Sequence, residues 1–149
     1  MSYVEFEYGA ETFAANVRSF YCYGYTPLLG FGQSRGDNRV RGGQIGRQPR
    51  DRVRDQLTVP LDWHVRGYET FAGGVGVSYH DQLKLNLYDL GGWFDAAPAG
   101  LFTVRVVVGA TTWEGEAHHE GFADAVWQGR QYEVQQTVTV YDGALAVMP

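Results

Sequence analysis

The sequence predicts a mainly β domain with one α-helix, and three observations carry this prediction. Five segments alternate apolar and polar residues with the two-residue period of half-buried strands. One further segment spaces its apolar residues as one face of a helix does. Hydrophobic residues make up 44% of the 149 residues and charged residues 19%, which excludes wholesale disorder and suits a single domain over residues 1–149.

The first two strands are expected at 4–8 and 57–65. On the first, the apolar face consists of Val4, Phe6 and Tyr8, and the polar face of Glu5 and Glu7. On the second, the apolar set is Leu57, Val59, Leu61, Trp63 and Val65. Each segment therefore presents one face to a core and the other to solvent.

Three more strands are expected near the end of the chain, at 101–108, 112–119 and 131–141. Gly109-Ala110 separates the first two of these, as in a two-residue β-hairpin. For the last strand, Tyr132, Val134, Val138 and Val140 are predicted to face inward, and Glu133, Gln135, Thr137 and Thr139 outward. The pattern favours an antiparallel arrangement.

A helix is predicted over about 79–90, because Tyr79, Leu83, Leu87 and Leu90 fall on one helical face. Ser78 is the expected N-cap, with Asp81 three residues later, and Gly91-Gly92 is the expected stop. The centre of this segment also alternates as a strand does, and the start, stop and length favour a helix.

A long loop is expected over about 26–55, where glycine is frequent and apolar periodicity is absent. A second glycine-rich loop is expected at 67–77. Within the first loop, residues 33–55 hold seven Arg and three Asp, a net charge of +4, whereas the whole chain has a net charge of −5. A basic segment is therefore attached to an acidic body.

Cysteine usage and the first residues limit the protein class further. Cys22 is the sole cysteine, so an intramolecular disulfide is excluded, and a packed thiol is the expected state. No signal peptide and no membrane-spanning run is recognisable, which predicts a soluble protein made in the cytoplasm.

Catalytic and metal-binding patterns are weak. Glu114, Glu116 and His118 would share one strand face, and His118 and Glu116 are the candidates for a metal site, but no second ligand group with suitable spacing accompanies them. No serine or cysteine lies in a nucleophile elbow. The prediction is a protein without catalysis, cofactor or resident metal.

The arginine-rich loop favours subunit contact over nucleic-acid binding, because the rest of the chain is acidic and Asp is interleaved with Arg. Trp63 and Trp113 are expected in the core, and two other tryptophans next to turn residues at a contact surface. The candidate interface residues are Arg35, Arg39, Arg41, Arg47, Arg50, Arg52, Arg54, Trp93 and Trp127. An alternative is a carbohydrate-binding β-sandwich module in host attachment, with exposed aromatics as its platform.

Read in order, these pieces resemble the tail tube and distal tail (minor tail) proteins of long-tailed bacteriophages, especially those of actinobacterial phages. The resemblance covers roughly residues 4–142. It rests on the first strand, Thr26-Pro27-Leu28-Leu29, Arg41-Gly42-Gly43, Leu57-Thr58-Val59-Pro60-Leu61, Asn86-Leu87-x-x-Leu90 and Gly100-Leu101-Phe102-Thr103-Val104.

This resemblance implies an antiparallel β-sandwich or barrel of the tail tube type, flanked by the helix. It also implies a structural virion protein of the phage tail, assembled in the host cytoplasm. Six copies would form a ring around a DNA channel, contacting other tail proteins and passing DNA but no membrane. The long loop would reach a neighbouring subunit, and an acidic lumen would let DNA slide.

Overall fold

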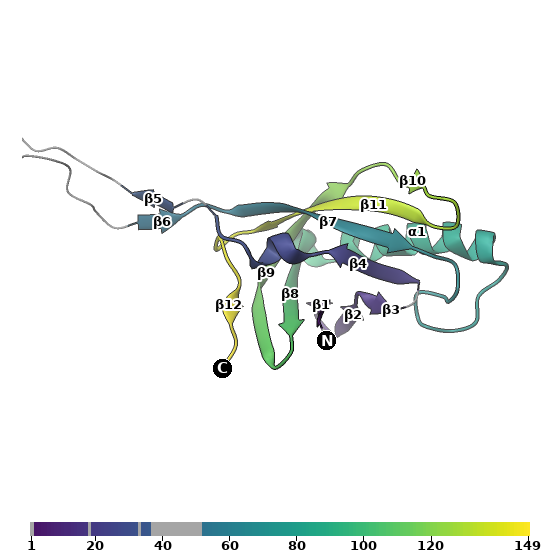
Figure 1. The fold of residues 1–149 in the computed structure, drawn as a ribbon, viewed down its shortest axis with the longest axis horizontal. Helices are drawn as coiled ribbons and strands as arrows, with labels where there is room; N and C mark the ends of the chain where they lie inside the picture. The colour runs from purple at the N-terminus through teal and green to yellow at the C-terminus, as the bar shows by residue number, and fades with distance from the viewer. Residues whose placement is uncertain (1, 18, 33, 37–51) are drawn as a thin grey trace, which may run out of the picture.

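Twelve strands, one α-helix and two 3-10 helices make up the part of the chain that the computed structural model describes, which is residues 2–17, 19–32, 34–36 and 52–149 (Figure 1). The strands are β1 (Ser2–Tyr8), β2 (Glu11–Ala14), β3 (Asn16–Val17), β4 (Phe20–Gly24), β5 (Ser34–Gly36), β6 (Arg52–Arg54), β7 (Leu57–Val65), β8 (Leu101–Val108), β9 (Thr111–Phe122), β10 (Val126–Trp127), β11 (Tyr132–Val140) and β12 (Ala146–Val147). The helices are η1 (Thr26–Leu29), α1 (Tyr79–Asp95) and η2 (Pro98–Gly100). The predicted mainly β class with one helix is confirmed.

One antiparallel sheet curls round until its two ends meet. The main strand order is β2-β1-β8-β9-β11-β7-β4-β3, so the two edge strands are consecutive in the chain. Ala15 lies between them: its N–H donates to the carbonyl of Val4 at 2.9 Å, and its carbonyl accepts from the N–H of Cys22 at 3.0 Å. Of the predicted alternatives, sandwich or barrel, the structure is nearer to a barrel: a curled sheet whose edge strands β2 and β3 are joined through Ala15.

The core lies inside this barrel and is rich in aromatic rings. Phe6 of β1 has ring contacts with Phe13, Trp63, Phe94 and Phe102, at centroid distances of 5.2–6.3 Å. Four of these five rings are no more than 3% exposed, and Phe13 is 5% exposed. Each such ring buries about 150–250 Å², so aromatic packing dominates the stability of the body.

The predicted strands at 4–8, 57–65, 101–108, 112–119 and 131–141 are all present, and Gly109 takes a positive φ of 59° in the predicted hairpin turn. The prediction that Thr139 faces solvent is wrong, because its side chain is only 4% exposed. Its hydroxyl lies 3.1 Å from that of Thr58 on β7. The neighbouring strand covers this side chain, which a single-strand pattern does not reveal.

Helix α1 is longer than predicted, because Gly91 and Gly92 do not end it. It continues to Asp95, and the side chains that follow the two glycines, Trp93 and Phe94, are 8% and 0% exposed. Two interior glycines cost roughly 1 kcal/mol each relative to alanine, and burial of two aromatic side chains outweighs that cost. Among the described residues, no helix is long and apolar enough to cross a membrane.

The start of α1 anchors the glycine-rich loop 67–77. Ser78 is the N-cap residue, as predicted, but its hydroxyl donates to the carboxylate of Asp81 at 2.9 Å and makes no hydrogen bond to the helix backbone. The buried side chain of Asn86 donates to the carbonyls of Arg66 and Glu69, both at 2.8 Å, and accepts from Gln82 at 2.8 Å. These polar contacts lie on the inward side of the helix and hold the loop against it.

The predicted loop 26–55 has more structure than expected at its two ends. It begins with η1, and β5 then pairs antiparallel with β6 in a hairpin stem that projects from the body (Figure 1). The stem is fixed at its base, where the N–H of Gly32 donates to the carbonyl of Gly143 at 2.6 Å. A Cβ on Gly32 would lie 1.9 Å from the carbonyl oxygen of Asp55, so the close crossing of the two chain segments requires glycine.

Candidate functional site

The outward side of β1, β8 and β9 bears a cluster of charges. Register places Glu5 of β1 and Glu114 of β9 on either side of Arg105 of β8. The guanidinium of Arg105 contacts Glu114 at 2.6 Å, Glu7 at 2.9 Å and Glu5 at 3.4 Å. One cation thus faces three carboxylates. We call this surface, with the exposed Glu116 beside it, the acidic face.

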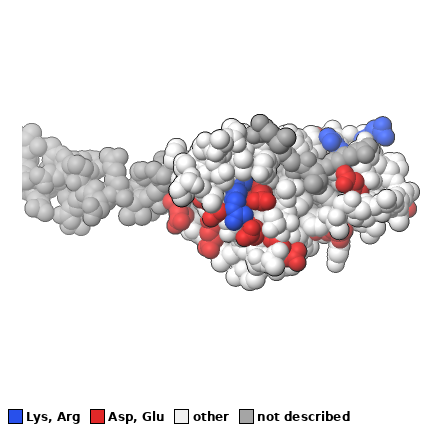
Figure 2. Space-filling model, turned by 90° about the horizontal axis from the view of Figure 1, so that it is seen from below, with Lys and Arg blue, Asp and Glu red and all other residues white. Residues whose placement is uncertain are grey.

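Arg105 organises the acidic face electrostatically. Its hydrogen bond and charge hold the pKa of Glu7 below the ordinary value, and the carboxylates in turn raise the pKa of Arg105. Figure 2 shows acidic side chains gathered around a basic one on this side of the body. The surface keeps an excess of negative charge, so it repels phosphate groups.

A second polar cluster links α1 to the inside of the barrel. Trp63 on β7 donates its indole N–H to Oε1 of Gln136 at 3.0 Å, and Nε2 of Gln136 lies 2.9 Å from Nδ1 of His119. Nε2 of His119 is 3.6 Å from Oδ1 of Asp95 at the end of α1. Desolvation by burial lowers the pKa of His119, and its ring stacks on Phe94 with centroids 5.3 Å apart.

The two predicted metal-ligand candidates lie on β9. Thr103 of β8 is the partner of Glu116 and Leu101 that of His118. Nδ1 of His118 lies 2.9 Å from a carboxylate oxygen of Glu120, whose pKa this contact lowers. Among the described residues, no group of three or more histidine, cysteine, aspartate or glutamate side chains is arranged to hold a metal ion.

The structure separates the two tryptophans that were expected on a contact surface. Trp127 on β10 is 45% exposed, with its ring centroid 6.0 Å from that of His80 on α1. The prediction that Trp93 lies on a contact surface is wrong, because its ring packs against Tyr8 and Phe13 in the core. The extension of α1 past the two glycines turns Trp93 inward.

Three of the seven arginines of the predicted interface belong to described strands. The backbone of Arg35 lies in β5, and the backbones of Arg52 and Arg54 lie in β6, so all three belong to the projecting hairpin stem. The other four predicted positions, Arg39, Arg41, Arg47 and Arg50, lie outside the described residues. Their role at an interface stays a prediction.

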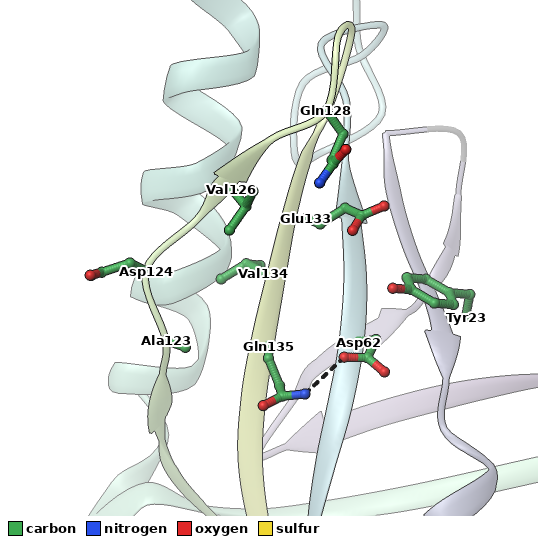
Figure 3. Close-up of a pocket in the computed structure, with 9 residues that line it drawn as sticks. All are labelled: Tyr23, Asp62, Ala123, Asp124, Val126, Gln128, Glu133, Val134 and Gln135. Carbon is green, nitrogen blue, oxygen red and sulfur yellow. Dashed lines mark hydrogen bonds between the residues drawn. The ribbon is translucent and has the colours of Figure 1, made fainter.

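A groove of about 280 Å³ lies on the outer side of β4, β7 and β11, beside the segment 123–128 (Figure 3). Tyr23, Asp62, Glu133, Gln135 and Gln128 supply its polar groups. The amide of Gln135 donates to Oδ1 of Asp62 at 3.1 Å. Sequence reasoning did not find this groove, because it combines three strands and a turn that are far apart in the chain.

Two signals in the sequence point to residues that were missed. Gln136 has the same strand parity as Val134 and Val138, which predicts an inward polar side chain with a buried partner. Tyr21 and Tyr23 alternate with Phe20 and Cys22, the pattern of a strand with tyrosines on its outer face. The thiol of Cys22 is buried, as expected, and burial raises its pKa.

The fold resembles that of a phage baseplate component. A chain of the phage P2 baseplate in its activated conformation with calcium superposes with a TM-score of 0.69 at 10% identity, covering 94% of this chain and 44% of the baseplate chain. The strontium form gives a TM-score of 0.64 at 11% identity, with the same coverage of both chains. The protein thus has a phage baseplate-type fold and spans less than half the length of the chains that it matches. No protein-family model matches the sequence, and no curated protein matches it significantly.

Proposed function

We propose that the protein is a structural subunit of a bacteriophage tail, forming a ring in the tail tube or distal tail and carrying out no catalysis. The observation that carries this proposal is the fold shared with a phage baseplate chain over 94% of the present chain. A barrel-like body with a projecting hairpin suits such a subunit, because the body is rigid and the hairpin extends beyond it.

The charge distribution supports the same proposal. In a ring of six copies, the acidic face would border the DNA channel, where its carboxylates repel the phosphate backbone and prevent DNA from adhering. The arginine-rich segment 33–55 would contact the neighbouring copy or another tail protein through charge-assisted hydrogen bonds. The assembled protein would then be a virion component.

The direct test is the mass and shape of the purified full chain. We expect light scattering coupled to size exclusion to show a concentration-dependent oligomer, and negative-stain microscopy to show rings with a central hole. A monomer at the highest attainable concentration, with and without DNA and neighbouring tail proteins, would contradict the proposal.

A charge-matched pair of double variants tests the role of the arginine-rich segment. Arg39→Glu with Arg41→Glu should abolish ring formation, because two contacts across the interface become repulsive. Lys84→Glu with Arg130→Glu changes the net charge equally but lies outside that segment, and should leave the rings intact. Equal behaviour of the two variants would show that the segment does not hold the copies together.

A further inference from the structure

The groove of Figure 3 is built from side chains that are already held in place. Gln135 is fixed by its hydrogen bond to Asp62, and Glu133 lies 3.1 Å from Nε2 of His64. The ring of Tyr23 packs on that of His64 with centroids 4.1 Å apart. Ordered side chains lose little conformational freedom when a ligand binds, which favours a binding site over an incidental hollow.

The polar groups converge on one space. In Figure 3 the hydroxyl of Tyr23 points toward Asp62 and Glu133, and the amide of Gln128 points into the groove from the other end. Val126, which is 54% exposed, supplies an apolar side. The groove therefore offers an aromatic edge, an apolar surface, two carboxylate acceptors and amide donors within a volume of about 280 Å³.

The charge of the groove restricts its ligand. Among the described residues, three acidic ones line the groove and no lysine or arginine does; the acidic residues are Asp62, Asp124 and Glu133. Burial raises the pKa of Tyr23, and the charges of Asp62 and Glu133 raise it further, as expected in a negative field. Phosphates, sulfates and acidic sugars would be repelled.

The groove contains both hydrogen-bond donors and acceptors, and this mixture favours a ligand that can both donate and accept. A guanidinium or ammonium group only donates, so it could pair with Asp62 and Glu133 but could not accept from the amide of Gln128. A hydroxyl group both donates and accepts, and neighbouring hydroxyls on a sugar ring match the adjacent amide and carboxylate of Gln135 and Asp62. The volume is close to the lower limit of ~300 Å³ for small-ligand pockets, which suits a single ring.

We propose that this groove is a carbohydrate-binding site for one uncharged sugar unit of a glycan. Asp62 and Glu133 accept hydrogen bonds from sugar hydroxyls, Gln135 and Gln128 donate to them, and Tyr23 with Val126 packs against the C–H groups of the ring. The site differs from a platform built on Trp127 or Trp93, since neither residue lines the groove. It also does not depend on ring assembly.

The test uses saturation-transfer NMR on the full chain with the methyl glycosides of glucose, galactose, rhamnose and N-acetylglucosamine. Glucuronate serves as the anionic probe and arginine amide as the cationic probe. At least one of these four uncharged sugars should bind, and glucuronate should not. Binding should weaken about tenfold or more in Tyr23→Ala and in Gln135→Leu, because each removes a central contact. Gln135 is exposed, so its variant keeps the fold, and circular dichroism checks both proteins.

Tyr21→Ala is the matched control, because Tyr21 is exposed on the same strand as Tyr23 but does not line the groove. It should bind sugar as the wild type does. Failure of every sugar to bind, unchanged binding by Gln135→Leu, or binding of arginine amide alone would each overturn the proposal. Loss of rings with sugar binding intact would count against the structural role only, and the reverse against this site only.

Discussion

The side-chain amide of Gln136 donates to Nδ1 of His119 across 2.9 Å, and this contact sets the protonation state of the imidazole. Oε1 of Gln136 accepts from the indole of Trp63, so its Nε2, which only donates, faces the histidine. Nδ1 must therefore accept, and the proton of the neutral ring lies on Nε2, toward Asp95. A proton added at Nδ1 would meet another donor.

This relationship predicts a loss of stability in mild acid. Burial lowers the pKa of folded His119 below its ordinary value of 6.5, so the folded state disfavours the added proton. The contribution of neutral His119 to the free energy of unfolding is fully present above pH 6.5 and is lost as the pH falls through the pKa of the folded state. Urea unfolding of His119→Asn, which retains an acceptor for Gln136, should depend less on pH in that range than unfolding of the wild type. His80→Asn, at an exposed position on α1, is the control and should behave like the wild type, and equal slopes in all three proteins would refute the assignment.

Removing the cation of the acidic face should destabilise the barrel in a salt-dependent way. In Arg105→Gln, Glu5, Glu7 and Glu114 face one another without a counter-charge, so the melting temperature should fall most at low ionic strength. The difference from wild type should shrink as salt approaches and exceeds ~0.1 M, where the Debye length is about 10 Å. Lys84→Gln, on the exposed side of α1, is the control and should show little effect at any salt concentration.

Alanine at two glycines should have opposite effects on stability. Gly92 lies inside α1 with open space where a Cβ would lie, so Gly92→Ala should raise the free energy of unfolding by about 0.5–1 kcal/mol. Gly100 has a φ of 71°, and a Cβ there would lie 2.8 Å from Nε2 of His118. Gly100→Ala should lower stability by at least about 1–2 kcal/mol. Denaturant titrations of both variants measure this, and a stabilised Gly100→Ala would contradict the backbone geometry.

Asn86 should control the attachment of the loop 67–77. Asn86→Ala removes the donor to two carbonyls and the acceptor for Gln82, which should cost about 1–3 kcal/mol. Limited proteolysis should then cut the loop faster than in the wild type. Tyr88→Ala, on the same helix at a side chain that is 79% exposed, should change stability by no more than about 0.5 kcal/mol. Unchanged cleavage in Asn86→Ala would mean that other contacts hold the loop.

Where the alternation of apolar and polar residues is regular, the sequence sufficed to predict the strands. β7 is the clearest case, because its apolar set is buried along its length except for the partly buried Leu57. β4 escaped prediction because Tyr21 and Tyr23, although outward, count as hydrophobic and so hide the alternation. Tyrosine suits both faces of a strand, and only the neighbouring strands decide which it takes.

Tertiary contacts decide where α1 ends and which strands form the groove of Figure 3, and local sequence signals do not. Two consecutive glycines indicate a helix end, yet the fit of Phe94 between Phe6 and Phe102 carries the helix past them. The groove of Figure 3 depends on the order of β4, β7 and β11, and strand order is not encoded in any local pattern. The sequence did indicate the uneven distribution of charge. The pairing of Arg105 with Glu5 on β1 and Glu114 on β9, in contrast, depends on the register of the three strands, which the sequence does not show.

The position of Ala15 between β2 and β3 has a consequence for how copies of the protein can contact one another. β2 occupies the hydrogen-bonding edge of β1, and β3 occupies that of β4. An exposed strand edge is a template on which a foreign strand can add and start amyloid-like growth. Because a segment of the same chain occupies both edges, the free edges of this strand path belong to β2 and β3, which are only four and two residues long and offer a neighbouring copy few backbone groups to pair with.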